Sequence, residues 1–181
     1  MKVISGMYKG RKIIGYDMKG TRPTMDRVKE SLFAMIQNHL TESTVLDLFA
    51  GSGNLGIESL SQGAAMAYFV DHNKQATKII KENVKTIGIE NANIINLDYL
   101  KALKYFAEIS IKFDVIFLDP PYDTNCIEKS IEKITEYNLL NKDGIIICES
   151  SNIDKIVYTN KYKSVKEKKY GDKWVVILKQ I

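Results

Sequence analysis

The sequence predicts an α/β fold built around one mostly parallel sheet with helices on both faces. Three observations lead to this prediction. Short apolar runs alternate with segments of helical periodicity between residues 45 and 149. A glycine-rich stretch at 50–56 directly follows the first run, as where a strand turns into a helix. The last two strand-like runs, 162–170 and 173–179, are separated only by Gly171-Asp172, which predicts a closing hairpin with an antiparallel final strand.

The chain begins with a predicted extension of about forty residues. Residues 2–5 and 11–15 flank a glycine-bounded stretch and predict a short hairpin. Thr24 or Asp26 then caps a helix that continues to about Asn38, and Pro23 fixes its entry. The apolar residues of this helix recur at helical spacing, at Val28, Leu32, Met35 and Ile36.

The remaining elements follow in alternation. Predicted strands at 45–49, 66–71, 92–96, 112–118 and 144–149 enclose predicted helices at 54–62, 73–87, 99–108 and 124–136. With the closing hairpin this makes seven strands. A chain of 181 residues suffices for one domain with a full core and is short for two. We therefore expect a single domain, 1–181, with an extension at 1–40 and a catalytic core at 41–181.

Composition excludes several classes of protein. Hydrophobic residues make up 45% and charged residues 27%, and no stretch approaches the roughly 18 apolar residues of a membrane span. The start of the chain lacks the apolar core of a signal peptide, so we expect a cytoplasmic protein. Cys126 and Cys148 lack metal-ligand spacing, which favours reduced structural thiols and no metal site.

Charge is concentrated at the start of the chain. Residues 1–40 carry eight basic and three acidic side chains, while the other 141 residues are close to −1. A basic extension on a nearly neutral body is typical of proteins that contact a phosphate backbone. A solvated lysine-rich surface is the alternative. The candidate RNA-binding residues are Lys9, Arg11, Lys12, Arg22 and Arg27.

The glycine stretch has the spacing G-x-G-x-x-G, with Asp71 about twenty residues further on, as in dinucleotide-binding domains. Asp47 changes the expected ligand, because its carboxylate precedes the glycines and would repel a pyrophosphate. It would attract an ammonium group, such as that of S-adenosylmethionine, by about 4 kcal/mol at 4 Å and an effective dielectric near 20. The alternative is a structural acid bonded to loop N–H groups.

Four acids stand at four successive predicted strand ends: Asp47, Asp71, Asp98 and Asp119. Because the carboxyl ends of parallel strands meet along one crevice, we expect these side chains to line one edge of the sheet. We assign the ligand ammonium to Asp47, ribose hydroxyls to Asp71, an adenine amine to Asp98 and the acceptor amine to Asp119. Each acid has an alternative role as a helix N-cap.

The last of these acids opens the run Asp119-Pro120-Pro121-Tyr122. The two prolines have no N–H and cannot continue a helix, so their carbonyls remain available to an outside donor. Tyr122 offers a flat face for stacking. The four residues suit a planar group with an exocyclic amine, and they are the candidate catalytic residues. A plain strand-to-loop turn is the alternative.

The run 46–53 together with 119–122 resembles class I S-adenosylmethionine-dependent methyltransferases that modify exocyclic amines of bases. The segments Val3-Ile4-Ser5-Gly6, Gly10-Arg11-Lys12 and 22–30 are similar to the bacterial guanine-N2 methyltransferases that modify the 16S ribosomal RNA of the small subunit. The resemblance covers nearly the whole chain. Asp71 departs from it, because glutamate is commoner there in the superfamily.

This resemblance implies the seven-stranded class I methyltransferase fold, S-adenosylmethionine as cofactor, and 16S rRNA or the assembled small ribosomal subunit as substrate. It implies a monomer that needs no metal. Besides Asp47, Asp71 and Asp98, the residues expected to contact the cofactor are Phe49, Ala50, Gly51, Gly53, Asn54, Leu55, His72 and Tyr99, with Arg22 and Thr24 from a segment expected to pack over it.

Three other functions remain possible from the sequence. An adenine-N6 methyltransferase acting on DNA or RNA uses a similar Pro-Pro run, more often led by asparagine, and its DNA-acting members normally carry an added recognition region. A nicotinamide oxidoreductase explains the glycines and Asp71 but leaves Asp47 and the prolines without a role. A non-catalytic RNA-binding module explains only the basic extension.

Overall fold

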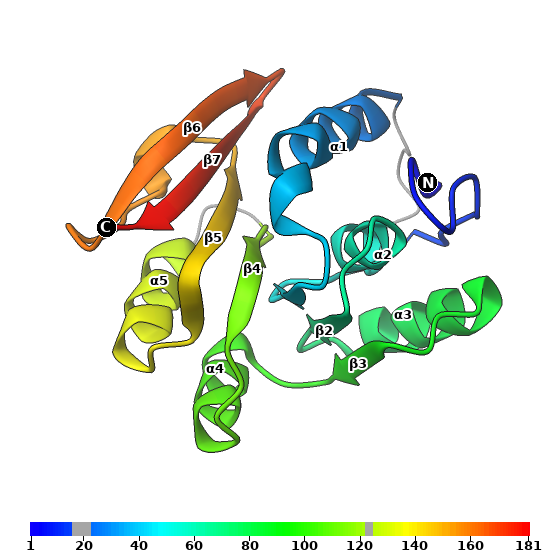
Figure 1. Cartoon of the computed structure of the whole chain (residues 1–181), viewed down its shortest axis with the longest axis horizontal. Helices are drawn as coiled ribbons and strands as arrows, with labels where there is room; N and C mark the ends of the chain where they lie inside the picture. Colours follow the sequence, from blue (N-terminus) through cyan, green and yellow to red (C-terminus); the bar gives the residue numbers. More distant parts are fainter. Residues whose placement is uncertain (16–22, 122–124) are drawn as a thin grey trace.

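The computed structural model describes residues 1–15, 23–121 and 125–181, with only the backbone described at 23–25. Its described strands form one seven-stranded sheet in the order β3-β2-β1-β4-β5-β7-β6 (Figure 1). The strands are β1 (Thr44–Asp47), β2 (Met66–Val70), β3 (Ala92–Ile95), β4 (Phe113–Leu118), β5 (Leu140–Ser150), β6 (Tyr162–Tyr170) and β7 (Lys173–Gln180).

Strands β1 to β5 pair in parallel, and β7 runs antiparallel to both of its neighbours, β5 and β6. This confirms the predicted fold, including the antiparallel last strand. The chain first builds the sheet from β1 towards β3 and then returns to place β4 on the other side of β1. The order therefore reverses between β1 and β4, where ligands bind in open α/β sheets.

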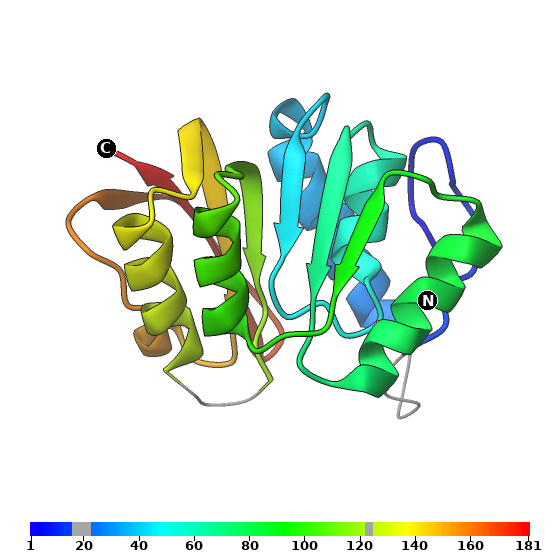
Figure 2. The ribbon, with the colours of Figure 1, turned by 90° about the horizontal axis from the view of Figure 1, so that it is seen from below.

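Helices cover both faces of the sheet (Figure 1). The α-helices are α1 (Pro23–Ile36), α2 (Asn54–Ser61), α3 (Lys74–Ile87), α4 (Tyr99–Glu108) and α5 (Cys126–Glu136), and the short 3-10 turns are η1 (Gln37–His39) and η2 (Ile153–Lys155). Side chains of α1, α2 and α3 share one apolar core, and those of α4 and α5 share the other. Figure 2 shows α4 and α5 side by side on their face. None of the described helices combines the length and apolar character needed to cross a membrane.

Most element bounds lie within two residues of the predicted ones. The main difference is β5, which begins at Leu140 rather than residue 144, because Leu140 already pairs with Phe113 before the register shifts. The polar residues between Leu140 and Gly144 hid this first part of the strand from a search for apolar runs.

The predicted N-terminal hairpin is reduced to one antiparallel bridge between Lys2 and Lys12. Val3 and Ile13 are nonetheless buried in the core that they share with α1 to α3. The segment is fixed by side chains of the helices beneath it. Asn83 of α3 accepts a hydrogen bond from the Ile14 N–H and donates to the Ile14 carbonyl. The extension is thus packed against the body of the protein.

A buried ion pair joins this extension to the glycine loop. Lys29 of α1 lies 2.9 Å from Glu58 of α2, and both side chains are almost wholly buried. Lys29 also donates to the Lys2 carbonyl at 2.8 Å and to the Asn54 side chain at 2.7 Å. Glu58 accepts from the N–H groups of Ile4 and Ser5. Removing either partner would leave an uncompensated buried charge, which costs about 3–5 kcal/mol.

Gly6 provides a test of how tightly the extension is docked. A Cβ at Gly6 would lie 1.8 Å from the Ser61 carbonyl oxygen, whereas one at Gly10 meets nothing within 4 Å. Both glycines have positive φ. Gly10→Ala should therefore cost only the left-handed strain of about 1–2 kcal/mol. Gly6→Ala should cost an additional 1–3 kcal/mol or so from overpacking. Urea unfolding of both variants measures the difference, and equal losses would mean that the extension is not held against α2.

Candidate active site

The glycine loop between β1 and α2 uses its glycines in two different ways. Gly51 and Gly53 have φ of 54° and 80°, a region that other residues rarely adopt. Gly56 lies in the first turn of α2, where a Cβ would come within 2.3 Å of the Phe69 ring of β2. The loop can turn tightly, and α2 can approach the sheet closely, only with these glycines.

Asp47 ends β1 and is only 2% exposed. One of its carboxylate oxygens accepts a hydrogen bond from the Gly56 N–H at 3.1 Å, so the structural role considered as an alternative is present. Burial nevertheless raises the pKa of Asp47 to about 7, against the effect of that hydrogen bond, and the charges of Asp119, Asp71 and Glu149 add to the rise. This carboxylate lies among other acids, and a nearby positive charge would favour its ionised form.

Asp71 follows β2 and supports the loop. Its two carboxylate oxygens accept hydrogen bonds from the N–H groups of Gly51 and Asn73, each at 2.9 Å. Carboxylate oxygens accept more than one hydrogen bond, so ribose hydroxyls can still be bound there. The neighbouring His72 is exposed, with Nδ1 3.7 Å from Asp71.

Asp98 is exposed and caps helix α4, where it accepts hydrogen bonds from the N–H groups of Leu100 and Lys101. Its bonding is that of a helix N-cap, and its assignment to an adenine amine stays a prediction. The ring of the next residue, Tyr99, packs against the ring of Phe49, with 5.2 Å between the ring centroids. Burial raises the pKa of the Tyr99 hydroxyl, and a hydrogen bond with Cys126 adds to the effect.

Asp119 follows β4 and takes part in a charged group that the sequence did not predict. Lys173, the first residue of β7, lies 3.4 Å from Asp119 and 3.4 Å from Glu149 of β5. Burial raises the pKa of Glu149 to about 7, with a contribution from the charge of Asp119, while Lys173 lowers it. Burial acts to lower the pKa of Lys173, but the two carboxylates outweigh it and the net direction is upward.

These side chains line one edge of the sheet, in the order Asp98, Asp71, Asp47, Asp119, Glu149 and Lys173 from β3 to β7. The expected gathering of the four acids at the carboxyl ends of the strands agrees with this order. Glu149 also ends an apolar run, which is the signal that identified the other acids, but only its strand was predicted. Lys173 carries no such signal, because its place depends on how β7 pairs with β5.

The other predicted site residues have varied positions. Asn54 is held by Lys29, and Ala50 is buried beside the core. Pro120 is half-buried. The exposed residues among them are Pro121, Lys9, Arg11, Lys12 and Arg27. Arg22, Tyr122 and the side chain of Thr24 lie outside the described residues. Within the described part of the chain, no three His, Cys, Asp or Glu side chains are grouped to hold a metal ion.

The chain is similar to known proteins along most of its length. It is 43% identical over 150 residues to the putative rRNA methyltransferase YlbH of Bacillus subtilis, a match covering 82% of each sequence. It is 36% identical to the ribosomal RNA small subunit methyltransferase D of Haemophilus influenzae, over 94% of this chain and 89% of that protein. The solved structure of the putative methyltransferase yhhF of Escherichia coli superposes with a TM-score of 0.86 at 27% identity, covering 99% and 97% of the two chains.

The sequence profile of one protein family, described as conserved hypothetical protein 95, matches residues 1–179. The match spans the N-terminal extension, the glycine loop, the acidic edge and the closing hairpin. The chain therefore belongs to the conserved hypothetical protein 95 family.

Proposed function

We propose that this protein transfers a methyl group from S-adenosylmethionine to the exocyclic N2 of a guanine in 16S ribosomal RNA. The observation that carries the proposal is the placement of Asp47 and Asp119 at the carboxyl ends of the paired strands β1 and β4, with one acid buried and the other half-buried. The names of the relatives in Bacillus and Haemophilus support ribosomal RNA as the substrate. We propose that the protein acts as a single-domain monomer in the cytoplasm.

The residues at the edge fit S-adenosylmethionine. An ammonium group beside Asp47 would offset the burial, and the repulsion from neighbouring acids, that raise the pKa of this carboxylate. The tilted pair of Phe49 and Tyr99 offers apolar ring faces to a purine, and Asp71 can accept hydrogen bonds from ribose hydroxyls. When bound, the cofactor supplies an electrophilic methyl group on a sulfonium.

The acceptor side must activate a weak nucleophile. The lone pair of the guanine 2-amino group is delocalised into the ring, so catalysis requires that it be localised and aimed at the methyl group. In our proposal Asp119 and the Pro120 carbonyl accept the two N–H bonds, which draws the nitrogen towards tetrahedral geometry. Acceptors fixed where positive charge develops stabilise the transition state, and close placement of the reactants supplies a further part of the rate. Pro121 stiffens this segment, and Tyr122 is proposed to stack on the extruded base.

Replacing Asp119 tests the acceptor role. Asp119→Ala should reduce methyl transfer to 16S rRNA by about 100-fold or more, the cost of losing one such electrostatic contact. The affinity for S-adenosylhomocysteine should stay within about threefold of wild type, since neutralising Asp119 leaves Asp47 in place. Transfer is measured with a tritiated methyl group and affinity by calorimetry.

Asp143→Ala is the matched control, because Asp143 pairs with Lys179 at the opposite edge of the sheet and is exposed. It should leave both quantities unchanged. A wild-type transfer rate in Asp119→Ala would refute the proposed role of Asp119.

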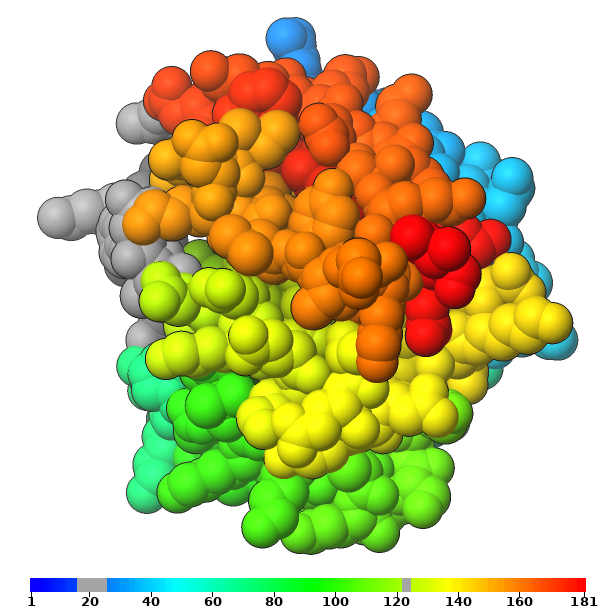
Figure 3. Space-filling view, turned by 90° about the vertical axis from the view of Figure 1, so that its left-hand side faces the viewer, coloured from blue at the N-terminus to red at the C-terminus, as the bar shows by residue number. Residues whose placement is uncertain are grey.

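The RNA surface includes more than the N-terminal extension. Although the net charge of residues 41–181 is close to −1, they include a second basic segment, residues 151–181, which carries eight lysines and three acids. Strand β6 lies at the outer edge of the sheet, and Figure 3 shows it on an open face of the molecule. Lys166, Lys168 and Lys169 are exposed, and none of them takes part in an ion pair found among the described residues.

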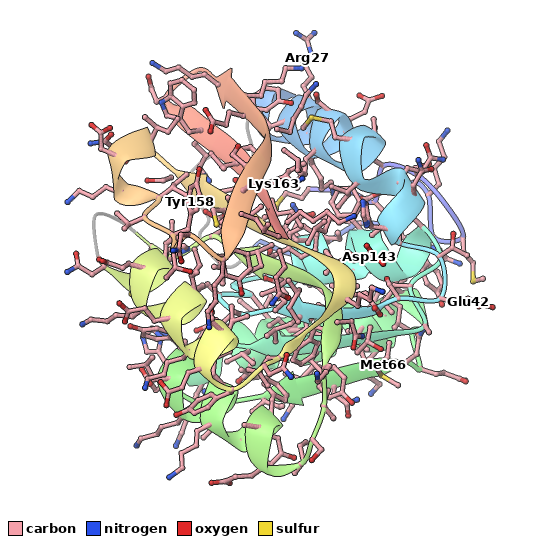
Figure 4. The ribbon with its side chains drawn as sticks, turned by 60° about the vertical axis from the view of Figure 1, so that its left-hand side comes forward. Arg27, Glu42, Met66, Asp143, Tyr158 and Lys163 are labelled. Carbon is pink, nitrogen blue, oxygen red and sulfur yellow. The ribbon has the colours of Figure 1, made fainter. Side chains whose placement is uncertain are left out.

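One of these lysines, Lys168, contacts helix α1 of the extension. Lys168 lies 3.3 Å from the hydroxyl of Ser31 on α1, one helical turn after Arg27. Figure 4 shows Arg27 projecting outward from α1 beside the β6–β7 hairpin. The hairpin turn leads directly to Lys173, which contacts Asp119. We propose that the target RNA backbone binds across this joint surface as well as Lys9, Arg11 and Lys12.

Neutralising the basic surface should weaken RNA binding in a salt-dependent manner. Each lost phosphate contact lowers the slope of log affinity against log salt by about 0.7–0.9. We expect the triple variant Lys166→Gln, Lys168→Gln, Lys169→Gln to lose about 2.1–2.7 units of slope, and the double variant Arg11→Gln, Lys12→Gln about 1.4–1.8. Filter binding of 16S rRNA across a salt series measures this.

The control replaces three other exposed lysines, Lys112, Lys142 and Lys161, by Gln. These lysines lie just before or at the start of their strands, at the opposite edge of the sheet. Its slope should match wild type. If the triple variant and this control lose the same slope, β6 is not a specific RNA contact.

A further inference from the structure

Lys173 joins two carboxylates that come from different strands. Strand β7 pairs antiparallel with β5, with Trp174 opposite Ser150, which brings Lys173 to the carboxyl end of β5. Its Nζ lies 3.4 Å from Asp119 and 3.4 Å from Glu149. The bonded oxygens of Asp119 and Glu149 therefore lie within twice that distance of each other, and both contact one ammonium group.

Glu149 is poorly satisfied in this arrangement. Its side chain is 8% exposed. Among the described residues the one hydrogen-bond partner found for its carboxylate is Lys173, at a distance longer than a typical N–H···O bond. A buried charge with one weak partner contributes little to the stability of the fold, and an apolar residue at this position would stabilise it at least as much. Such a group indicates a ligand that donates hydrogen bonds to it.

The chemistry of the three groups matches one edge of one base. Guanine presents the N1–H and the 2-amino group side by side as donors, with O6 next to them as an acceptor. Adenine presents a bare N1 lone pair at the corresponding position and no oxygen. Two carboxylates and one ammonium therefore complement guanine, while a carboxylate facing the adenine N1 would be repelled.

We infer that Glu149 and Lys173 read the Watson–Crick edge of the target guanine, with Glu149 accepting the N1–H and Lys173 donating to O6 while Asp119 holds the 2-amino group. This inference rests on the proposed function and assigns the base selectivity that the function requires. Lys173 exchanges its contact with Asp119 for one with O6 when the base enters. Enzymes that act on extruded bases read them in this way, by hydrogen bonds to the Watson–Crick edge.

A substrate analogue tests the inference. 2-Aminopurine keeps the amine to be methylated but lacks both the N1–H and O6. A site built to bond a substrate N–H rejects an analogue lacking it by as much as 10⁴–10⁵-fold. We therefore expect wild-type protein to prefer 16S rRNA with guanine at the mapped target over the same RNA, assembled by ligation, with 2-aminopurine there by about 1,000-fold or more in kcat/KM.

Variants of Glu149 and Lys173 then distinguish recognition of the base from a purely structural role of these side chains. Glu149→Met should reduce kcat/KM for guanine by about 100-fold, because the lost contact exists only with guanine. It should leave kcat/KM for 2-aminopurine equal or higher, because it removes a carboxylate that repels the bare N1 of this analogue. Glu149→Gln, which keeps an acceptor oxygen, should restore part of the preference. Lys173→Met should also lower the preference. Lys179→Met is the matched control, since Lys179 lies on the same strand and pairs with Asp143 at 3.3 Å, and it should keep the wild-type preference.

The outcomes are distinguishable. Equal losses on both substrates in Glu149→Met would show that Glu149 only supports the structure, and would overturn the inference while leaving the proposed function intact. A Glu149→Met variant with wild-type rates on both substrates would likewise overturn the inference and leave the proposed function intact. Wild-type protein that transfers no methyl group to the guanine substrate would remove the proposed function and the inference together.

Discussion

The structure depends on a concentration of negative charge at the carboxyl edge of one sheet. Asp71, Asp47, Asp119 and Glu149 lie at the carboxyl ends of four neighbouring strands, and within the described residues Lys173 is the only lysine or arginine that pairs with any of them. Burial and mutual repulsion raise the pKa of Asp47 and Glu149 to about 7. Such a site is costly in the empty protein and gains stability from a ligand with a cationic end and several N–H donors.

The surrounding fold holds these charges in place. Glycines let the loop after β1 turn beneath Asp47, and Asp71 bonds that loop to the end of β2. The buried pair of Lys29 and Glu58 connects the same loop, through Asn54, to the N-terminal extension. The extension is therefore coupled to the proposed cofactor side of the acidic edge, while the β6–β7 hairpin is coupled to the proposed acceptor side through Lys173.

Much of this was predictable from the sequence, for physical reasons. Parallel strands buried on both faces read as continuous apolar runs, and acids directly after such runs are easy to recognise. What the sequence did not predict depends on pairing between distant segments. Lys173 reaches Asp119 only because β7 lies beside β5, and Glu58, Ser61 and Asn83 hold the extension from inside ordinary-looking helices. The sequence also allowed two roles for the Asp98 carboxylate, a ligand contact or a helix N-cap, and only the structure shows that it caps α4.

The most direct measurement is the number of protons released when S-adenosylhomocysteine binds. The ammonium of the ligand should favour the ionised form of Asp47 and lower its pKa from about 7, so that the protonated fraction present near pH 6.5 gives up its proton. Calorimetric titrations in buffers of different ionisation enthalpy should show release of about three-quarters of a proton in the wild type and little in Asp47→Asn. Binding without proton release, or equal release in both proteins, would contradict the account.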